Sequence, residues 1–134
     1  MKKKLVWYVM LFATPFAALN THPVWADTPA GILKSYGAPA GTDAAKRGEL
    51  FFTSKHGKDW SCSSCHSSMP NKATEHIVTG KRIEALAPLV NENRFTDAAK
   101  SEKWFKRNCK DVLGRECSAQ EKVDVISWLL TIKK

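Results

Sequence analysis

The sequence contains only four cysteines, and their spacing argues against a zinc site. Cys62 and Cys65 form one C-x-x-C pair, but Cys109 and Cys117 lack the spacing of the second ligand pair that a structural zinc site needs. The sequence also lacks a βαβ pattern around the first pair, which argues against a thioredoxin-like redox site. The C-x-x-C pair therefore needs another chemical explanation.

The sequence has no uninterrupted apolar run long enough for a typical bilayer span. The run from Leu5 to about Leu19 contains Pro15, and a transmembrane helix needs about 20 consecutive apolar residues. Lysines at positions 2–4 precede the run, and compact residues ending at Ala26 follow it. This arrangement predicts a signal peptide over residues 1–26, cleaved after Ala26, and a periplasmic location. An uncleaved membrane anchor is the alternative.

Acidic residues are few, with 13 against 21 basic residues. The predicted signal peptide holds three of the basic residues and no acidic one, which leaves 18 against 13, a net charge of +5. A basic protein attracts an acidic protein partner, because opposite fields speed the encounter of weak redox complexes. Export argues against nucleic acid as the partner. A merely solvated basic surface explains the charge equally well.

The pentapeptide from Cys62 to His66 has the pattern C-x-x-C-H, which is the attachment sequence of a c-type haem. Two thiols on one helical turn can join the two vinyl groups of a single porphyrin, and the adjacent imidazole then becomes the proximal iron ligand. We therefore predict one covalently attached haem c, held by Cys62 and Cys65, with His66 on the iron. In an oxidising compartment, the remaining Cys109 and Cys117 are expected to form a disulfide.

The sixth iron ligand is less certain from the sequence. Electron-transfer cytochromes c commonly use methionine, but Met69 is the only methionine after residue 26. It follows His66 by three residues, which span at most about 10 Å, with the porphyrin plane in between. Methionine ligation is therefore disfavoured, while His56, His76 and, more weakly, Lys81 stay open. Asn108 by itself looks like the polar C-terminal residue of a helix.

The pattern of caps and apolar positions predicts an all-α fold in one domain. We expect an irregular lead-in over residues 27–41, with one turn around 32–36, and a haem-binding domain over residues 42–134. A helix begins after Thr42 and Asp43 and runs to about Thr53. Gly48 within it suggests a close helix crossing, although a merely tolerated glycine is the alternative.

Further along, residues 62–67 should form a short helical turn that carries the haem motif. A long irregular stretch to residue 94 follows, as expected where a backbone wraps a flat cofactor. The next helix starts after Asp97 and runs to about Asn108. The last helix opens with a capping box, formed by Ser118 and Glu121, and extends to Ile132.

Several of these residues carry a family likeness. Gly48, the phenylalanines at 51 and 52, the haem motif and Trp128 resemble the class I cytochrome c fold. The downstream strings together resemble the Sphaeroides haem protein family, which are oxygen-binding mono-haem cytochromes c. These strings are Thr79-Gly80-Lys81, Leu86-Ala87-Pro88, Arg94-Phe95-Thr96-Asp97, Glu102-Lys103-Trp104-Phe105, Arg107-Asn108-Cys109 and Gly114-Arg115-Glu116-Cys117.

The resemblance implies His66 as proximal ligand, Asn108 as distal ligand and a bridge between Cys109 and Cys117. It further implies a monomeric, high-spin cytochrome in which reduction displaces Asn108, so that ferrous haem can bind O2 or NO. Electrons would come from a dihaem c-type cytochrome and a membrane cytochrome b. Both a gas-binding protein and a haem redox protein that reduces O2 or NO fit this chemistry.

Two alternatives remain beside that implication. Trp104, four residues before Asn108, would share its helix face and could line the distal pocket, although plain core packing is the preferred interpretation. The second functional hypothesis is a low-spin electron-transfer cytochrome c with His/His ligation, in which His76 is the sixth ligand.

Overall fold

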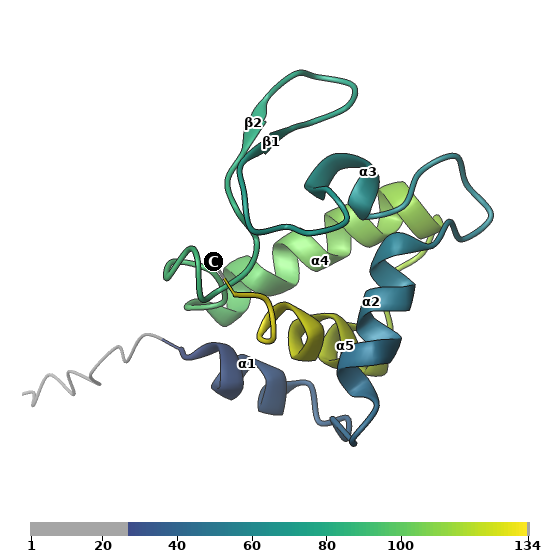
Figure 1. The fold of residues 1–134 in the computed structure, drawn as a ribbon. Helices are drawn as coiled ribbons and strands as arrows, with labels where there is room; N and C mark the ends of the chain where they lie inside the picture. Colours follow the sequence, from purple (N-terminus) through teal and green to yellow (C-terminus); the bar gives the residue numbers. More distant parts are fainter. Residues whose placement is uncertain (1–26, 134) are drawn as a thin grey trace, which may run out of the picture.

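A computed structural model describes residues 27–133, and this part of the chain is mostly helical (Figure 1). The predicted signal peptide lies outside the described residues. The elements in chain order are α1 (Pro29–Ser35), α2 (Ala44–Thr53), α3 (Ser63–His66), β1 (Thr74–Glu75), β2 (Arg82–Ile83), α4 (Ala98–Leu113) and α5 (Ala119–Leu129). The predicted all-α class is confirmed. Over residues 27–133, none of the helices has the length and apolar character that crossing a bilayer requires.

Helices α2 and α5 cross at close range, and this crossing is the centre of the fold (Figure 1). Gly48 on α2 is buried, and a Cβ added to it would lie 1.9 Å from the carbonyl oxygen of Asp124 on α5. Only a residue without a side chain fits there. The expected close crossing is therefore present, and Gly48 is not merely tolerated.

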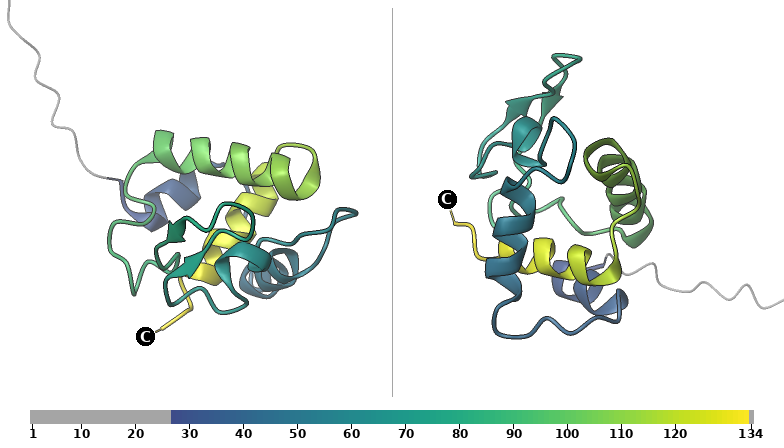
Figure 2. Two further views of the ribbon diagram at one scale, coloured as in Figure 1. Left: turned by 90° about the horizontal axis from the view of Figure 1, so that it is seen from above. Right: turned by 90° about the vertical axis from the view of Figure 1, so that its right-hand side faces the viewer.

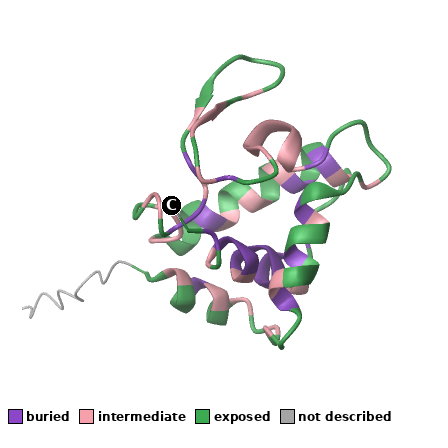
Figure 3. Ribbon diagram, viewed as in Figure 1, coloured by how far each residue is buried: buried purple, intermediate pink, exposed green. Residues whose placement is uncertain are grey.

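The hydrophobic core is built on α5, most of whose residues are buried (Figure 3). Its central cluster consists of Phe52, Ala87, Val125, Trp128, Leu129 and Ile132. The rings of Phe52 and Trp128 lie 4.9 Å apart between centroids. Cys62 of the haem motif packs against this cluster, so the motif is attached to the rigid centre of the molecule.

The segment 27–41 is more ordered than expected, because α1 replaces the predicted single turn at 32–36. Thr28 caps this helix by accepting a hydrogen bond from the Gly31 amide at 3.0 Å, and Pro29 occupies the first turn. Ile32 is almost fully buried. The cap and one buried side chain are enough to hold a seven-residue helix against α5, and the prolines and glycines around it concealed this in the sequence.

Helix α4 extends five residues beyond the predicted end at Asn108. Asp97 caps its start by accepting a hydrogen bond from the Lys100 amide at 2.8 Å. The helix ends where Gly114 adopts a left-handed conformation, with φ of 77°. Asn108 is therefore an interior residue of α4, and the interpretation of it as a C-terminal helix residue was wrong.

Two short strands interrupt the stretch that was expected to be irregular. β1 and β2 pair antiparallel, with Thr74 opposite Ile83. Two-residue strands carry almost no sequence signal, because alternation needs about four residues to be visible. Downstream, α5 begins with the predicted capping box of Ser118 and Glu121 and ends at Leu129, three residues before the expected end.

Candidate haem site

The haem motif occupies α3, a single helical turn that begins directly after its N-cap residue, Cys62. The His66 amide donates to the Cys62 carbonyl at 3.1 Å, which closes this turn. Cys62 and Cys65 are half-buried, and their thiols are not joined to each other. A three-residue offset on one turn places both thiols on the same side of the helix. This arrangement suits two thioether bonds to one porphyrin.

The ionisation of these groups argues against a redox-active thiol pair. Burial raises the pKa of the Cys62 thiol to about 11, whereas reactive C-x-x-C sites have a lowered pKa. Burial also lowers the pKa of His66 to about 4, with smaller contributions from the charges of Arg94 and His76. The imidazole is therefore neutral, which is the form that binds a metal.

The residues present fit a covalently bound haem better than a bare metal ion. Over residues 27–133, no three side chains of histidine, cysteine, aspartate or glutamate are grouped to hold a metal ion. One neutral imidazole beside two unpaired thiols is the donor set that a c-type haem needs, because the porphyrin supplies the other four iron ligands.

The α2–α5 crossing positions the imidazole. The Phe52 ring lies 6.0 Å from the His66 ring between centroids, and it also packs against Trp128. Phe52 is 2% exposed and therefore cannot reorient freely. The proximal ligand rests on an aromatic stack that is continuous with the core.

Two residues that the sequence did not single out support the motif from the hairpin side. Thr74 on β1 donates from its hydroxyl to the Cys65 carbonyl at 2.7 Å. Arg94 donates to the carbonyls of Ala85 at 2.9 Å and Glu84 at 2.7 Å, directly after β2. The Arg94 charge reaches His66, since it contributes to the lowered pKa of that imidazole. Thr74 belongs to no motif that the sequence analysis identified. Arg94 belongs to one of the strings that carry the family likeness, but that string gives no indication of a role near the haem motif.

Ser67, immediately after the proximal ligand, adopts a conformation that non-glycine residues rarely adopt. Its φ is 65° and its ψ is 157°. Such a residue costs about 1–3 kcal/mol and persists only where its surroundings hold it. Here the Ser67 hydroxyl both donates to the Met69 carbonyl at 3.0 Å and accepts from the Met69 amide at 3.1 Å. The serine thus stabilises the sharp exit from α3.

Asn108 and Trp104 lie one turn apart on α4. In the side view, α2 with α3 lies toward one end of α5 and α4 lies toward the other end (Figure 2, right). Asn108 is half-buried, and its carboxamide makes no hydrogen bond to any residue in the part of the chain that the structure describes. Trp104 is 43% exposed, with the Arg107 guanidinium 5.6 Å from its ring centroid. The preferred interpretation of Trp104 as a core residue was wrong.

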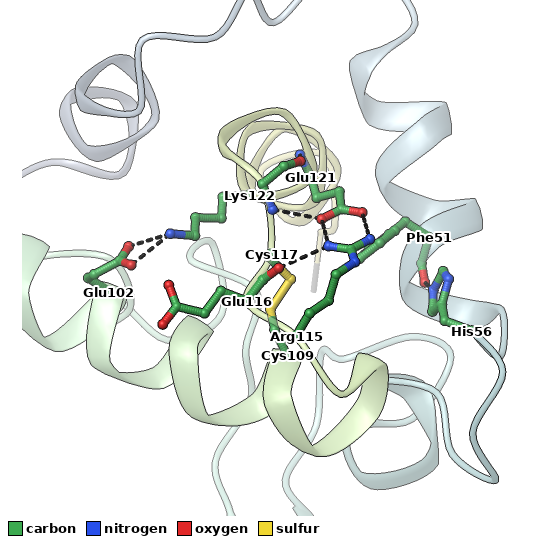
Figure 4. Close-up of a disulfide and its surroundings, with 10 residues drawn as sticks. Phe51, His56, Glu102, Cys109, Arg115, Glu116, Cys117, Glu121 and Lys122 are labelled. Atoms are coloured by element: carbon green, nitrogen blue, oxygen red, sulfur yellow. Dashed lines mark hydrogen bonds and ion pairs between the residues drawn. A yellow bond between two sulfur atoms is a disulfide. The ribbon is translucent and has the colours of Figure 1, made fainter.

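The expected disulfide joins Cys109 to Cys117, and both cysteines are buried (Figure 4). Their Cα atoms are 5.6 Å apart, so the bridge ties the C-terminal half of α4 to the start of α5. A second connection lies further along both helices, where the Lys122 ammonium contacts both carboxylate oxygens of Glu102 at 2.7 and 2.8 Å. The backbone at Asn108 is therefore held next to a covalent anchor.

Of the other candidate ligands, the two histidines form hydrogen bonds with the backbone, and the methionine and the lysine are exposed. The Nδ1 atom of His76 accepts from the amides of Val78 at 3.2 Å and Thr79 at 3.3 Å. The Nε2 atom of His56 lies 2.8 Å from the Phe51 carbonyl, to which it can only donate (Figure 4). Met69 is 51% exposed on the loop that leaves α3. Lys81 is exposed in the turn of the hairpin.

Comparison with known proteins agrees with a haem site. Residues 38–129 match a family model described as a domain of unknown function, DUF1924. The chain is 46% identical over 103 residues to cytochrome c'' of Methylophilus methylotrophus, an alignment that covers 74% of this chain and 69% of that protein. It is 43% identical over 107 residues to the cytochrome c-type protein SHP of Cereibacter sphaeroides, covering 76% and 82%.

Solved structures of these two relatives share the fold. The structure of oxidised SHP, described as an oxygen-binding cytochrome c, matches with a TM-score of 0.68 at 40% identity and covers 78% of this chain and 98% of that chain. A solution structure of cytochrome c'' that addresses the structural basis of haem-ligand detachment matches with a TM-score of 0.63 at 38% identity, covering 79% and 94%.

Proposed function

This chain belongs to the DUF1924 family and is a mono-haem c-type cytochrome related to cytochrome c'' and SHP, and on this basis we propose that Asn108 is its redox-sensitive sixth iron ligand. In this proposal the Asn108 carboxamide would hold the ferric iron and would release it on reduction. Reduction would thereby make a position available for O2 or NO. The observation that carries the proposal is that Asn108 is a half-buried residue whose carboxamide has no hydrogen-bond partner among residues 27–133.

Different residues of the chain have different roles in holding the haem. Cys62 and Cys65 attach the macrocycle, and His66 provides a neutral proximal imidazole. When bound, the haem supplies an iron that changes between the ferric and ferrous states and accepts small ligands at an open position. Phe52 and Thr74 hold the motif in place, so the proximal side stays rigid while the distal side changes.

The chemistry of asparagine suits a ligand that detaches. A carboxamide oxygen is a neutral, hard and weak donor, and it should bind ferric iron better than ferrous iron. The disulfide at Cys109 restrains the backbone next to Asn108, so side-chain rotation is the available movement. The description of SHP as oxygen-binding supports O2 as a ligand, and the study of ligand detachment in cytochrome c'' supports a labile sixth ligand.

The geometry disfavours the alternative of a low-spin carrier with His76 as sixth ligand. Because the Nδ1 atom of His76 accepts two backbone hydrogen bonds, the neutral ring carries its proton on Nε2. Binding iron through Nε2 would move that proton to Nδ1 and break both hydrogen bonds. Asn108 has no such contacts to lose.

The cellular setting is part of the same proposal. A disulfide between Cys109 and Cys117 suits an oxidising compartment, in agreement with the export signal expected over residues 1–26. We place the protein in the periplasm as a monomer without nucleic-acid partners. Its electron donors would be a dihaem c-type cytochrome and a membrane cytochrome b, as the family resemblance implies.

Spectroscopy of the purified holoprotein tests the ligand assignment. The ferric protein should show high-spin optical and EPR signals, and the reduced protein should bind carbon monoxide. Asn108→Ala should change the ferric spectrum, while the matched variant His76→Ala should leave it unchanged. A purely low-spin ferric iron, without a carbon monoxide adduct after reduction, would contradict the proposal, as would a spectrum altered by His76→Ala alone.

A further inference from the structure

We propose that the solvent-facing side of α4 is a docking surface for an acidic electron-transfer protein. This surface, the α4 basic face, consists of Lys100, Lys103, Arg107 and Lys110, all of which are exposed. Their spacing of three, four and three residues places them along one side of a helix. The inference rests on the proposed function, because a redox-linked ligand needs an electron donor.

The charge on this face is not neutralised within the protein. Over residues 27–133, none of its four cations forms an ion pair, whereas other cations nearby do. Lys106 on the same helix pairs with Glu116 at 3.1 Å, and Lys122 pairs with Glu102 at 2.7 Å. Like charges three and four residues apart destabilise a helix. No ion pair among residues 27–133 offsets this repulsion, so an acidic partner would stabilise the basic face.

The opposite side of α4 packs on the protein, so the basic face points outward. Ser101, Cys109 and Val112 are the buried residues of this helix, and its outer side is exposed along its length (Figure 3). Trp104 lies beside the basic face and is 43% exposed, with Arg107 over its ring. Tryptophan and arginine are enriched where protein surfaces bind each other.

The same helix connects this surface to the haem site. Arg107 directly precedes Asn108, and Trp104 lies one turn before it. Asn108 lies between the exposed and the buried sides of α4, as its half-buried state indicates. A protein docked on the basic face would therefore approach the haem from the side of the proposed distal ligand. An acidic partner fits, because opposite charges accelerate encounter and orient weak redox complexes.

Charge-neutralising variants of the holoprotein test this surface. The test variant carries Lys100→Gln, Lys103→Gln, Arg107→Gln and Lys110→Gln. The matched control carries Lys34→Gln, Lys46→Gln, Lys55→Gln and Lys72→Gln, which are exposed lysines outside α4, and it has the same net charge. Stopped-flow reduction of the ferric protein by reduced flavodoxin, an acidic redox protein, gives the second-order rate constant as a function of ionic strength.

We expect the test variant to lose about tenfold or more in rate constant at low ionic strength and to lose most of the salt dependence. The control variant should retain most of the wild-type rate constant and most of its salt dependence. Equal losses in the two variants, or no loss in the test variant, would overturn the proposal. Binding to vesicles of phosphatidylserine and phosphatidylcholine is measured in parallel. If only vesicle binding falls in the test variant, the face binds a membrane and the proposal fails.

A failure of the docking surface can be distinguished from a failure of the Asn108 ligand assignment. Neutralising the basic face should leave the ferric spectrum and carbon monoxide binding unchanged, because its four residues are exposed and none of them is proposed to bind the haem. Asn108→Ala should instead change the spectrum and retain the salt dependence of reduction. A low-spin protein whose reduction still depends on the α4 basic face would support the docking surface while overturning the ligand assignment.

Discussion

An added side-chain carbon at Gly48 would lie 1.9 Å from the carbonyl oxygen of Asp124, so α2 and α5 cross with their backbones in direct contact. This contact determines how closely Phe52 on α2 approaches Trp128 on α5, at 4.9 Å between ring centroids. The Phe52 ring also lies 6.0 Å from the His66 ring, so the spacing of the crossing affects the position of the predicted proximal ligand.

Gly48→Ala should therefore destabilise the holoprotein by at least about 2 kcal/mol, because an overpacked crossing forces the two backbones apart. Urea denaturation followed by far-UV circular dichroism measures this loss. Gly31→Ala in α1 is the matched control, since its added carbon meets only the Thr28 hydroxyl, at 3.2 Å. If the two substitutions lower the free energy of unfolding equally, the α2–α5 crossing can adjust to an added carbon without losing stability.

Removing the disulfide should loosen the helix that carries Asn108. We expect the double variant Cys109→Ser, Cys117→Ser to lose about 2–3 kcal/mol of unfolding free energy, because the bridge closes a short loop. Hydrogen exchange should accelerate most over residues 106–113, with α2 much less affected. Uniform acceleration over the whole protein would show that the bridge acts globally and not on α4.

The contribution of the α5 capping box to the free energy of unfolding should depend on pH. Hydrogen bonding from Arg115 holds the pKa of Glu121 below its usual value, with a further contribution from the Ser118 amide. A carboxyl whose pKa is lower in the folded state stabilises the protein above its unfolded pKa and loses this contribution as the pH falls. Glu121→Gln should therefore be destabilising at pH 7, and the difference from wild type should shrink on acidification.

Ser118→Ala removes the other half of the same cap and gives the comparison. It should cost about 1 kcal/mol. Unlike the Glu121 effect, most of this loss should persist in acid, because a hydroxyl does not titrate in this range. Denaturation midpoints at several pH values distinguish the two variants, and a pH-independent effect of Glu121→Gln would contradict the assignment.

Ser67 offers a test of local strain beside the proximal ligand. Its φ of 65° suits glycine, while its hydroxyl makes two hydrogen bonds to Met69. Ser67→Gly should relieve strain and lose the hydrogen bonds, so its net effect should be small. Ser67→Ala should lose the hydrogen bonds and keep the strain, and it should therefore be the more destabilised variant in thermal unfolding. The reverse order would show that the exit from α3 is not strained.

Arg94 should influence the reduction potential. Its guanidinium is half-buried and donates to the carbonyls of Glu84 and Ala85. Its positive charge contributes to the lowered pKa of the His66 imidazole. Removing a nearby cation favours the more positive ferric state, so Arg94→Met should lower the potential in a redox titration. Arg94→Lys keeps the charge and should retain most of the wild-type potential. If the potential is lowered in both variants, the change comes from altered loop geometry and not from the charge of Arg94.

The features of the fold that depend on neighbouring residues could be predicted from the sequence. The helical turn of the C-x-x-C-H motif and the capping box at Ser118 each depend on residue types within a few positions, and both are present as expected. The crossing at Gly48 is a contact between distant residues, and the sequence only suggested it through a glycine inside a helix. The end of α4 was misjudged, because the αL glycine at 114 ends it and the polar residues at 110 and 111 continue the helix. Trp104 was misjudged because apolar character alone does not say which side of a helix is covered.

By itself the sequence predicted how the haem is attached and which histidine is its proximal ligand, since thioether formation and ligation involve three side chains on one helical turn. It also determined the pairing of Cys109 with Cys117, because no other cysteines remained. Only the tertiary structure decided what surrounds them. Thr74 and Arg94 reach the motif through the β1–β2 hairpin and its backbone carbonyls. Such contacts depend on backbone placement in space, which no local pattern of residues encodes.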